Sequence, residues 1–364
     1  MAAYQRIKLG DVAHIKTGKR NNQDKKPFGK YPFFVRSSTI EKIDTYSFDG
    51  EAILMPGEGN IGDIIHYIDG KFDFHQRVYK ISNFIDGIYG KYVFYALQKS
   101  FKTWALKNTV KATVDSLRLP TFQGFEFLAP DFQQQKQIVR MLEAVNAHIS
   151  NLEKLISKQE SIKKSTEKML LTPKADWQQV RLGDIVDYYK GCGLSKEKLS
   201  SNGNYPCILY GELFTKYNEI IDEAQSKTFI NEGFSSCYDD ILLPGSTTTC
   251  GEDLIKASAI LQDDVLLGGD IIVLRPNKRL VCGRFLAYLI SQYKKDMLKY
   301  TQGITIIHLQ GHKMMDLQIK IPNLVVQLDI VNNIIKIDEH LKQLRYSLDK
   351  LCNIKTGMMS YFFG

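Results

Sequence analysis

The most constraining feature of this 364-residue chain is an internal duplication, because two stretches follow the same plan in the same order. The motif Leu9-Gly10-Asp11 returns 173 residues later as Leu182-Gly183-Asp184. Three further pairs of segments match: Tyr31-Pro32 with Arg36 against Tyr205-Pro206 with Tyr210, Ile53-Leu54-Met55-Pro56-Gly57 against Ile241-Leu242-Leu243-Pro244-Gly245, and Gly90-Lys91-Tyr92 with Tyr95 against Gly283-Arg284-Phe285 with Tyr288. The spacing between partners grows to about 192 residues, so the second copy has the longer loops. We expect two related domains.

Each copy ends in a long series of apolar residues spaced by fours and threes. In the first copy the series comprises Ile138, Leu142, Val145, Ile149, Leu152 and Ile156. In the second copy it comprises Ile330, Ile334, Ile337, Leu341, Leu344, Leu348 and Leu351. A 3.5-residue repeat of apolar residues is typical of a coiled-coil seam. These residues are therefore predicted to form the core of a helix pair.

Both helices are predicted to begin just after a proline, Pro130 or Pro322, with Asp131 and Asn323 as N-caps. Each seam then corresponds to roughly 50 Å of helix. Two equivalent helices in a duplicated chain can bury their seams on each other around a pseudo-twofold axis, which makes the pair antiparallel. The alternative is that each helix packs only on its own domain. Length favours the pair, because such a helix extends beyond a domain of ~120 residues.

The rest of the chain indicates a mixed α/β (α+β) fold class. Short β-like runs alternate with turn signals and helical stretches: strands at 52–55, 62–68, 77–81 and 271–274, turns at Asp49-Gly50 and Asp69-Gly70, and helices at 89–107 and 283–300. The expected order is a globular domain (1–129), a central helix (130–172), a second globular domain (173–321) and a C-terminal helix (322–364). Two pseudo-twofold-related domains would be separated by a two-helix antiparallel coiled coil.

Charge is distributed unevenly between the two copies. The formal net charge is +8, from 48 Lys and Arg against 40 Asp and Glu. Residues 1–172 hold 26 basic and 18 acidic residues, whereas residues 173–364 hold 22 of each. A cationic face attracts phosphates by Coulomb attraction and counterion release, and an ordinary solvated surface explains the same charges equally well. An acidic stretch at 253–270 is expected to face away from any nucleic acid.

Several classes of protein are excluded by the sequence. No apolar run approaches the ~20 residues of a bilayer span, and the first residues lack the apolar core of a signal peptide. We therefore expect a cytoplasmic protein with no membrane partner. The six cysteines contain no CxxC pair, so reduced thiols are expected rather than a zinc site.

Catalytic motifs are missing as well. Residues 57–62 fit the GxGxxG pattern, but the following residues look like a strand rather than the helix that a dinucleotide or S-adenosylmethionine loop requires. The matching loop of the second copy loses the pattern. No phosphate-binding loop, metal-binding histidine motif or nucleophile elbow is present, and His66 and His75 are interpreted as surface or turn residues. The sequence indicates a chain that catalyses nothing and binds no metal.

The duplicated motifs resemble those of the specificity subunit of type I restriction-modification systems. They are Ile7-Lys8-Leu9-Gly10-Asp11, Val180-Arg181-Leu182-Gly183-Asp184 and the proline-started helices beginning at 130 and 322. Gln134 and Val326 stand where the family commonly has Glu, which affects the capping of these helices. The resemblance covers essentially the whole chain, and the duplicated order of the motifs is more specific than any one of them.

This resemblance implies a non-catalytic subunit that reads double-stranded DNA. In such proteins two target-recognition domains each read one half of a bipartite, asymmetric site, and the paired helices act as a ruler for the spacer between the halves. Two methyltransferase subunits dock on the chain, supply S-adenosylmethionine and flip an adenine, and motor-nuclease subunits join for restriction. No cofactor is then expected on this chain itself.

Candidate DNA-binding residues are cations and polar groups, because phosphates need cations and base edges need Arg, Lys, Asn, Gln or Glu. In the first domain they are Lys19, Arg20, Lys25, Lys26, Arg36, Arg77, Lys111 and Thr113. By repeat equivalence or charge, the second domain offers Lys190, Tyr210, Glu212, Lys278, Arg279, Thr305 and His308. For each of them, solvated surface is an equally good interpretation. Two other hypotheses stay open: a coiled-coil scaffold that binds only proteins, and a diverged nuclease or methyltransferase.

Overall fold

The computed structural model of the protein describes residues 4–59, 62–108 and 116–364. The chain divides into two compact units: unit 1 comprises Met1–Leu155 and Arg345–Gly364, and unit 2 comprises Ile156–Leu344. The long helices α4 (Phe132–Leu171) and α9 (Leu324–Phe363) have 40 residues each, and both are shared between the two units. Each unit therefore contains one globular α/β part and a segment of both helices.

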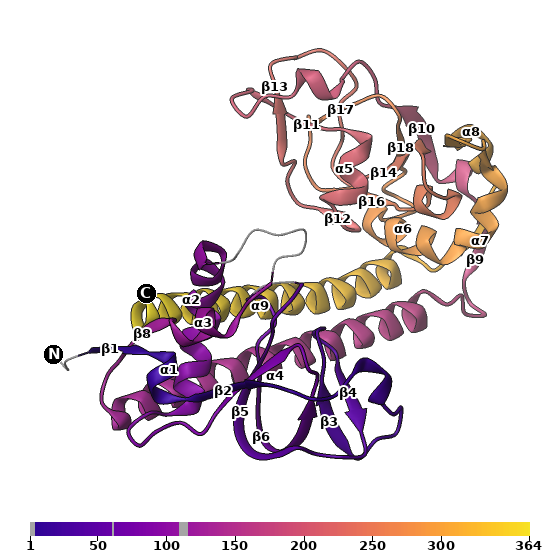
Figure 1. The fold of residues 1–364 in the computed structure, drawn as a ribbon. Coiled ribbons are helices and arrows are strands. Elements are labelled where there is room, and N and C mark those ends of the chain that lie inside the picture. The colour runs from indigo at the N-terminus through magenta and orange to yellow at the C-terminus, as the bar shows by residue number, and fades with distance from the viewer. Residues whose placement is uncertain (1–3, 60–61, 109–115) are drawn as a thin grey trace. The chain divides into compact units, whose positions relative to one another are not determined.

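Unit 1 contains a six-stranded sheet of order β2-β7-β5-β6-β3-β4 (Figure 1). Neighbouring strands are antiparallel except β3 and β6, which run parallel. The strands are β2 (His14–Thr17), β3 (Tyr31–Phe34), β4 (Ile40–Ile43), β5 (Phe48–Pro56), β6 (His66–Phe74) and β7 (Val78–Ser82). The other elements are β1 (Gln5–Lys8) paired with β8 (Glu126–Ala129), α1 (Leu9–Val12), η1 (Asn22–Asp24), α2 (Gly90–Asn108) and α3 (Leu119–Gln123).

Unit 2 repeats this arrangement, but its sheet is divided into β10-β18-β14-β16-β12 and β13-β11-β17. The strand that corresponds to β6 is split into β16 and β17, and β17 keeps the parallel pairing with β11. The strands are β10 (Val186–Lys190), β11 (Tyr205–Ile208), β12 (Ile220–Ile221), β13 (Ser226–Thr228), β14 (Asp240–Pro244), β16 (Ser258–Ile260), β17 (Leu266–Leu267) and β18 (Ile271–Pro276).

Further elements complete unit 2. They are β9 (Gln178–Arg181) paired with β21 (Gln318–Ile321), the small sheet of β15 (Ser246–Thr247), β20 (Ile307–Leu309) and β19 (Thr301–Gln302), the helices α5 (Tyr210–Thr215), α6 (Gly283–Ile290), α7 (Lys294–Met297) and α8 (Gly311–Met314), and the 3-10 turns η2 (Leu182–Asp184), η3 (Lys196–Lys198), η4 (Gly251–Leu254), η5 (Ser291–Tyr293) and η6 (Leu298–Tyr300). The two units thus share one topology, as the duplication predicts.

The Leu-Gly-Asp motif closes each domain. Leu9 and Leu182 are fully buried, and their backbone N–H groups donate to the carbonyl oxygens of Phe125 at 2.8 Å and Leu317 at 2.9 Å. A Cβ atom on Gly10 would lie only 2.9 Å from a neighbouring side chain, so the close approach requires glycine. The motif therefore fastens the first strand of each domain to the segment that precedes its long helix.

Within unit 1, the start of α4 and the end of α9 contribute to the same apolar cluster. Ile138 and Leu142 are buried there, and Met358 and Phe362 pack against the same apolar cluster. Because the start of one helix meets the end of the other, these segments are antiparallel.

Within unit 2, the end of α4 meets the start of α9. Leu171, Ile330 and Ile334 are buried in one apolar cluster. Lys163 on α4 forms an ion pair with Asp338 on α9, with 2.7 Å between Nζ and Oδ1. The predicted antiparallel pairing is therefore confirmed, and the residues of both predicted seams are all buried or half-buried.

The helix starts follow the sequence prediction. Asp131 Oδ1 accepts the N–H of Gln134 at 3.0 Å, and Asn323 Oδ1 accepts the N–H of Val326 at 3.1 Å. Both are N-cap bonds that satisfy one of the free donors of the first turn. Capping thus holds in spite of the two departures from the family pattern, because the cap residue itself supplies the acceptor.

Some local predictions are wrong. The strand expected at 62–68 begins only at His66, as β6. Asp49-Gly50 and Asp69-Gly70 do not form turns, because Gly50 and Gly70 face each other in the middle of β5 and β6. Both glycines have φ above +130°, a conformation that favours glycine and lets two long strands cross with a local distortion. Composition alone does not distinguish this use of Asp-Gly from a hairpin turn.

The helix expected at 283–300 is also interrupted. Only α6 is a regular helix of more than one turn, and it is followed by η5, α7 and η6. In the first copy, α2 runs unbroken from Gly90 to Asn108, close to the predicted 89–107. None of the helices in the described ranges combines the length and the hydropathy of a membrane span.

Candidate nucleic-acid interface

Unit 1 has a polar hollow of about 420 Å³ on its surface. It lies where the segment after β3, the segment after β5 and the turn before β7 meet. The lining residues are Asn22, Lys25, Val35, Arg36, Ser37, Glu41, Glu58, Gly59 and His75. Most of these side chains carry hydrogen-bonding or charged groups, so the hollow suits a polar ligand rather than an apolar one.

Two arginines share one carboxylate at this hollow. Glu58, just after β5, accepts hydrogen bonds from Arg77 on one oxygen and from Arg36 on the other, the latter at 3.4 Å. The arginine side chains are about half exposed, at 52% and 53%, whereas Glu58 is 23% exposed. Of the contacts that the described residues make, each guanidinium uses a single nitrogen, although it carries five N–H donors. The two arginines and Glu58 together keep one net positive charge, and the remaining guanidinium nitrogens stay available as donors.

The backbone of Arg77 is held from both sides. Its N–H donates to Nδ1 of His75 at 3.0 Å, and its carbonyl oxygen accepts the N–H of Gly57 at 2.9 Å. Burial lowers the pKa of His75, and the charges of Arg36 and Arg77 lower it further. A neutral imidazole is therefore favoured, which leaves Nδ1 free to accept this bond. His75 is thus buried, contrary to its interpretation as a surface residue, and it opens the turn before β7, in agreement with its interpretation as a turn residue.

Arg20, one of the predicted DNA-binding residues, has hydrogen-bond partners inside the domain. Its guanidinium donates to Asp73 at 3.1 Å and to Thr45 at 3.0 Å, and Asp73 is fully buried at the end of β6. Asp73 also accepts hydrogen bonds from Thr45 and Ser47. A buried carboxylate needs these partners, so Arg20 stabilises the sheet, while its side chain stays 40% exposed.

The other predicted residues of unit 1 differ in their surroundings. Lys25 forms an exposed ion pair with Glu41 at 2.9 Å, a contact of small energetic weight that a phosphate can displace. Lys19 and Lys26 are exposed. Lys111 and Thr113 lie outside the described residues. Of these residues, the structure therefore brings Lys25 and Arg36 together at the hollow, next to the turn that carries Arg77.

Glu212, a predicted DNA-binding residue of unit 2, also has its partners inside the domain. It is buried, accepts the N–H of Leu209 at 2.8 Å, and is bonded to Lys216 and Ser226. Its carboxylate therefore caps α5 and holds the neighbouring strand, with no free face toward a ligand. The remaining candidates of unit 2 are all exposed: Lys190, Tyr210, Lys278, Arg279, Thr305 and His308.

Unit 2 has a network of hydroxyl and carboxylate groups where unit 1 has its arginines. Gly245 N–H donates to the carbonyl oxygen of Asp270 at 2.6 Å, as Gly57 does to Arg77. The side chain that follows, Ser246, donates to the carboxylate of Asp270. The backbone of Ser246 pairs with that of His308 on β20. The equivalent place in unit 2 thus presents acceptors.

Sequence reasoning missed three residues of these sites: Glu58, Ser246 and Asp270. A signal was present, because Glu58 and Ser246 directly follow the matched Pro-Gly pairs that end a strand in each copy. The GxGxxG pattern drew attention to a cofactor instead. This segment connects β5 to β6, and the next described element after it is a strand.

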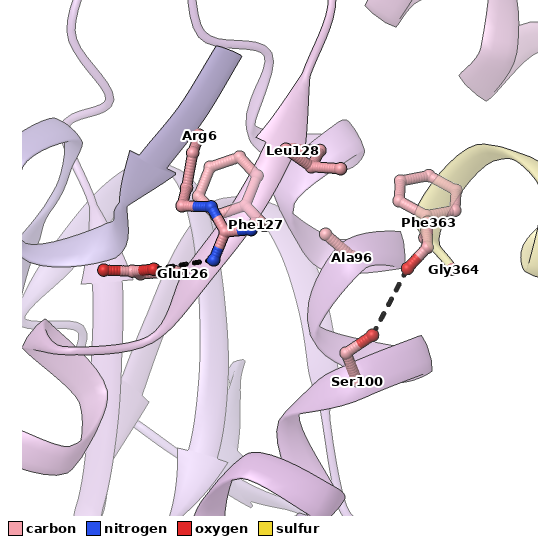
Figure 2. Close-up of a pocket in the computed structure, with 8 residues that line it drawn as sticks. All are labelled: Arg6, Ala96, Ser100, Glu126, Phe127, Leu128, Phe363 and Gly364. Atoms are coloured by element: carbon pink, nitrogen blue, oxygen red, sulfur yellow. Dashed lines mark hydrogen bonds and ion pairs between the residues drawn. The ribbon is translucent and has the colours of Figure 1, made fainter. Parts of the chain in front are cut away.

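A second pocket, of about 170 Å³, lies between β8, α2 and the end of α9 (Figure 2). Arg6 and Glu126 form an exposed ion pair at its edge, and Ser100 Oγ donates to the carbonyl oxygen of Phe363 at 3.4 Å. The remaining wall is mostly apolar. The pocket is a packing gap at the helix end rather than a set of convergent reactive groups.

Among residues 4–59, 62–108 and 116–364, no group of three or more His, Cys, Asp or Glu side chains is placed to hold a metal ion. The cysteines are all free thiols.

A family model of the type I restriction modification DNA specificity domain matches the chain twice, over residues 1–163 and 174–348. The EcoDI specificity subunit of a type I restriction enzyme from Escherichia coli is 24% identical over 177 residues, which is 46% of this chain and 37% of that protein. The MjaVIII specificity subunit from Methanocaldococcus jannaschii is 24% identical over 195 residues, or 52% of this chain and 42% of that protein. The matched region thus spans less than half of either relative.

Among solved structures, the S subunit of a type I restriction-modification system from M. genitalium is similar over 100% of this chain and 96% of that one. The TM-score is 0.66 at 16% sequence identity. At this identity the likeness concerns the fold, and it extends over both domains and both helices.

Proposed function

The chain belongs to the family of type I restriction-modification DNA specificity proteins, and we propose that it is the subunit that reads DNA sequence for such a complex. The observation that carries the proposal is the duplication itself: the family model matches both halves, and each half is an α/β domain packed on a segment of the antiparallel helices. Each domain would read one half of a bipartite, asymmetric DNA site. The chain would supply recognition and no catalysis.

The surface chemistry of the two domains supports two different half-sites. Unit 1 offers arginines beside a polar hollow, and unit 2 offers the carboxylate of the exposed Asp270 at the equivalent place. Guanidinium groups favour guanine, whereas carboxylates accept from the amino group of cytosine. Equal half-sites would call for equal side chains at these positions.

The helices would act as a ruler in this proposal. Each has 40 residues, which corresponds to about 60 Å. Helix length would then set the number of unread base pairs between the half-sites. The exposed parts of the helices and the domain edges would receive two methyltransferase subunits, which would bring S-adenosylmethionine, and motor-nuclease subunits would join them.

The experiment maps the recognised site for three proteins: the wild-type chain, a chain with residues 1–129 exchanged for those of another family member, and a chain with seven residues deleted from each helix (149–155 and 341–347). Each is purified with its co-purifying subunits and offered a library of random duplexes. The exchange should change one half-site only. The deletions keep the seam in phase and should shorten the spacer by about 10 Å, or about three base pairs.

The scaffold hypothesis predicts a different result. A protein that binds only other proteins would show no sequence preference and no affinity that falls steeply with salt. Absence of any enriched sequence for the wild-type protein at low ionic strength would refute the proposed function. An unchanged spacer after the paired deletions would refute the ruler while leaving recognition intact.

A further inference from the structure

The geometry of the Arg36–Glu58–Arg77 group in unit 1 suits recognition of a particular base rather than general affinity for DNA. Three chain segments bring it together: Arg36 and Glu58 line the hollow, and Arg77 contacts it through its bond to Glu58. A phosphate contact needs only a mobile cation, and the exposed Lys19 and Lys26 provide that. An arginine whose backbone and guanidinium are both fixed is suited instead to a target with a fixed pattern of acceptors.

Arg77 is the more constrained of the two arginines. Its backbone N–H is bonded to the buried His75 and its carbonyl oxygen to Gly57, and Glu58 holds one nitrogen of its guanidinium. The shared carboxylate aligns the guanidinium and leaves its other nitrogens as donors. Arg36, on the second oxygen of Glu58, adds a further donor set at the same place.

Guanine is the base that matches this donor pattern. In the major groove it presents two adjacent acceptors, O6 and N7, and an arginine fork binds them with two parallel hydrogen bonds. Adenine, cytosine and thymine each lack this acceptor pair. Charge supports the same assignment, because the group keeps one net positive charge after Glu58 is counted.

Resting on the proposed function, we propose that Arg77, positioned by Glu58 and assisted by Arg36, makes the first domain selective for a guanine in its half-site. Glu58 is a positioning residue in this scheme, since its carboxylate acts through the arginines. At the equivalent place in unit 2, the exposed Asp270 is an acceptor that binds the buried Ser246, so this guanine contact belongs to the first domain.

The test determines base preferences for the wild-type protein and for Arg77→Ala, with full-length chains and their co-purifying subunits. Arg77→Ala should abolish the preference for guanine at one position, by roughly 5- to 150-fold, and leave the other positions intact. Replacing that guanine by 7-deazaguanine removes the N7 acceptor. This probe should weaken binding of the wild-type protein and have little effect on Arg77→Ala.

Glu58→Gln separates positioning from simple support of the fold. Loss of the carboxylate frees both arginines and adds a net positive charge to the site. Preference for guanine should fall while affinity for unrelated DNA rises, with a salt dependence steeper by about one counterion. A merely structural role would lower both together. Arg6→Ala is the matched control, because Arg6 also pairs with a glutamate in unit 1 and its loss should not change any base preference.

Each of three results would overturn the inference while recognition as such stands. The first is a wild-type preference that survives Arg77→Ala at every position, and the second is a lost preference at a position that does not require guanine. Sensitivity of Arg77→Ala to 7-deazaguanine equal to that of the wild type would also overturn it. If the wild-type protein selects no sequence at all, the proposed function itself fails, and this is seen before any variant is compared.

Discussion

The ends of β5 and β14 carry opposite chemistry on the same backbone. In unit 1, Gly57 N–H bonds the carbonyl oxygen of Arg77, and Glu58 bonds its side chain. In unit 2, Gly245 N–H bonds the carbonyl oxygen of Asp270, and the following serine bonds its carboxylate. The same backbone hydrogen bonds constrain the loop in both units, whereas the side chains of Glu58 and Ser246, and of Arg77 and Asp270, differ. Duplication therefore preserves where each domain presents its side chains and not what they present.

In the interior of the two units, by contrast, an equivalent position keeps the same side chain in both copies. Gln135 and Gln327 are fully buried at the same place in the first turns of α4 and α9. Gln135 bonds the backbone of Pro130, Gly87 and Tyr89, and Gln327 bonds that of Pro322, Leu280 and Cys282. Each buried side chain satisfies three backbone groups in buried or partly buried hydrogen bonds, so a change at either position is costly and the residue is the same in both copies.

The largest effect is expected from removing these glutamines. Gln135→Ala and Gln327→Ala should each lower the free energy of unfolding of their own unit by about 2–4 kcal/mol, because three buried or partly buried backbone groups lose their partner. Chemical denaturation combined with hydrogen exchange of each unit measures this. The exposed neighbours Gln133→Ala and Asn332→Ala serve as controls with expected changes near zero. A large loss at only one glutamine would break the equivalence of the two units.

A smaller effect is expected where the helix pair differs between the units. In unit 2, Lys163 lies near Asp338 at 2.7 Å, Glu167 at 3.4 Å and Glu219 at 3.8 Å, and although burial works against its charge, these carboxylates raise its pKa. Lys163→Met leaves the carboxylates uncompensated and should cost about 1–3 kcal/mol. The equivalent Lys355→Met in unit 1 should cost much less, in a comparison by denaturation.

Unit 1 has a neutral residue where unit 2 has Asp338, which indicates how the uncompensated negative charge in Lys163→Met can be reduced. Asn146, which is 192 residues before Asp338, donates to the hydroxyl of Tyr95 at 3.0 Å, where Asp338 accepts from Tyr288 at 3.1 Å. Adding Asp338→Asn to Lys163→Met should therefore restore part of the lost stability. No recovery in the double variant would mean that Lys163 acts by packing rather than by charge.

The smallest effect concerns a buried cation of unit 1. Lys80 on β7 is 4% exposed, lies over the ring of Phe48, and occupies the register position that Val273 holds in unit 2. Burial, with a smaller effect of Lys16, lowers the pKa of Lys80 to about 8. The folded chain therefore binds fewer protons than the unfolded chain between pH 8 and 10.5, and its stability should rise with pH across that window.

Lys80→Val tests this pH dependence. At pH 7 the variant should be more stable than the wild type, because it buries no cation. Loss of the cation–π contact limits this gain to about 1 kcal/mol, and the gain should shrink toward pH 10.5. Thermal unfolding at a series of pH values measures the difference. Lys71→Val, at an exposed lysine of the same sheet, should show no such dependence. A gain that stays constant with pH would indicate packing rather than charge.

Local and periodic features were predictable from the sequence. The duplication, the two long helices, their N-caps and the antiparallel pairing follow from spacing within short windows and from the equivalence of the two copies. The predicted strands were correct where apolar residues run without interruption, as at Ile53 and Ile271. They failed at Gly50 and Gly70, because a glycine inside a strand and a glycine in a turn have the same local composition.

The sequence by itself thus determined the architecture, because helix periodicity and the repeated order of motifs can be recognised without knowing any contact in space. Only the tertiary structure decided which charged residues remain available. Arg20 and Asp73 are 53 residues apart, Arg77 and Glu58 are 19 apart, and Arg36 reaches the same glutamate from a third segment. Such partners are chosen by strand order and register, and the energy of a charge depends on its neighbours in space. For that reason the tertiary structure alone distinguished an arginine that stabilises the sheet from one positioned at the surface.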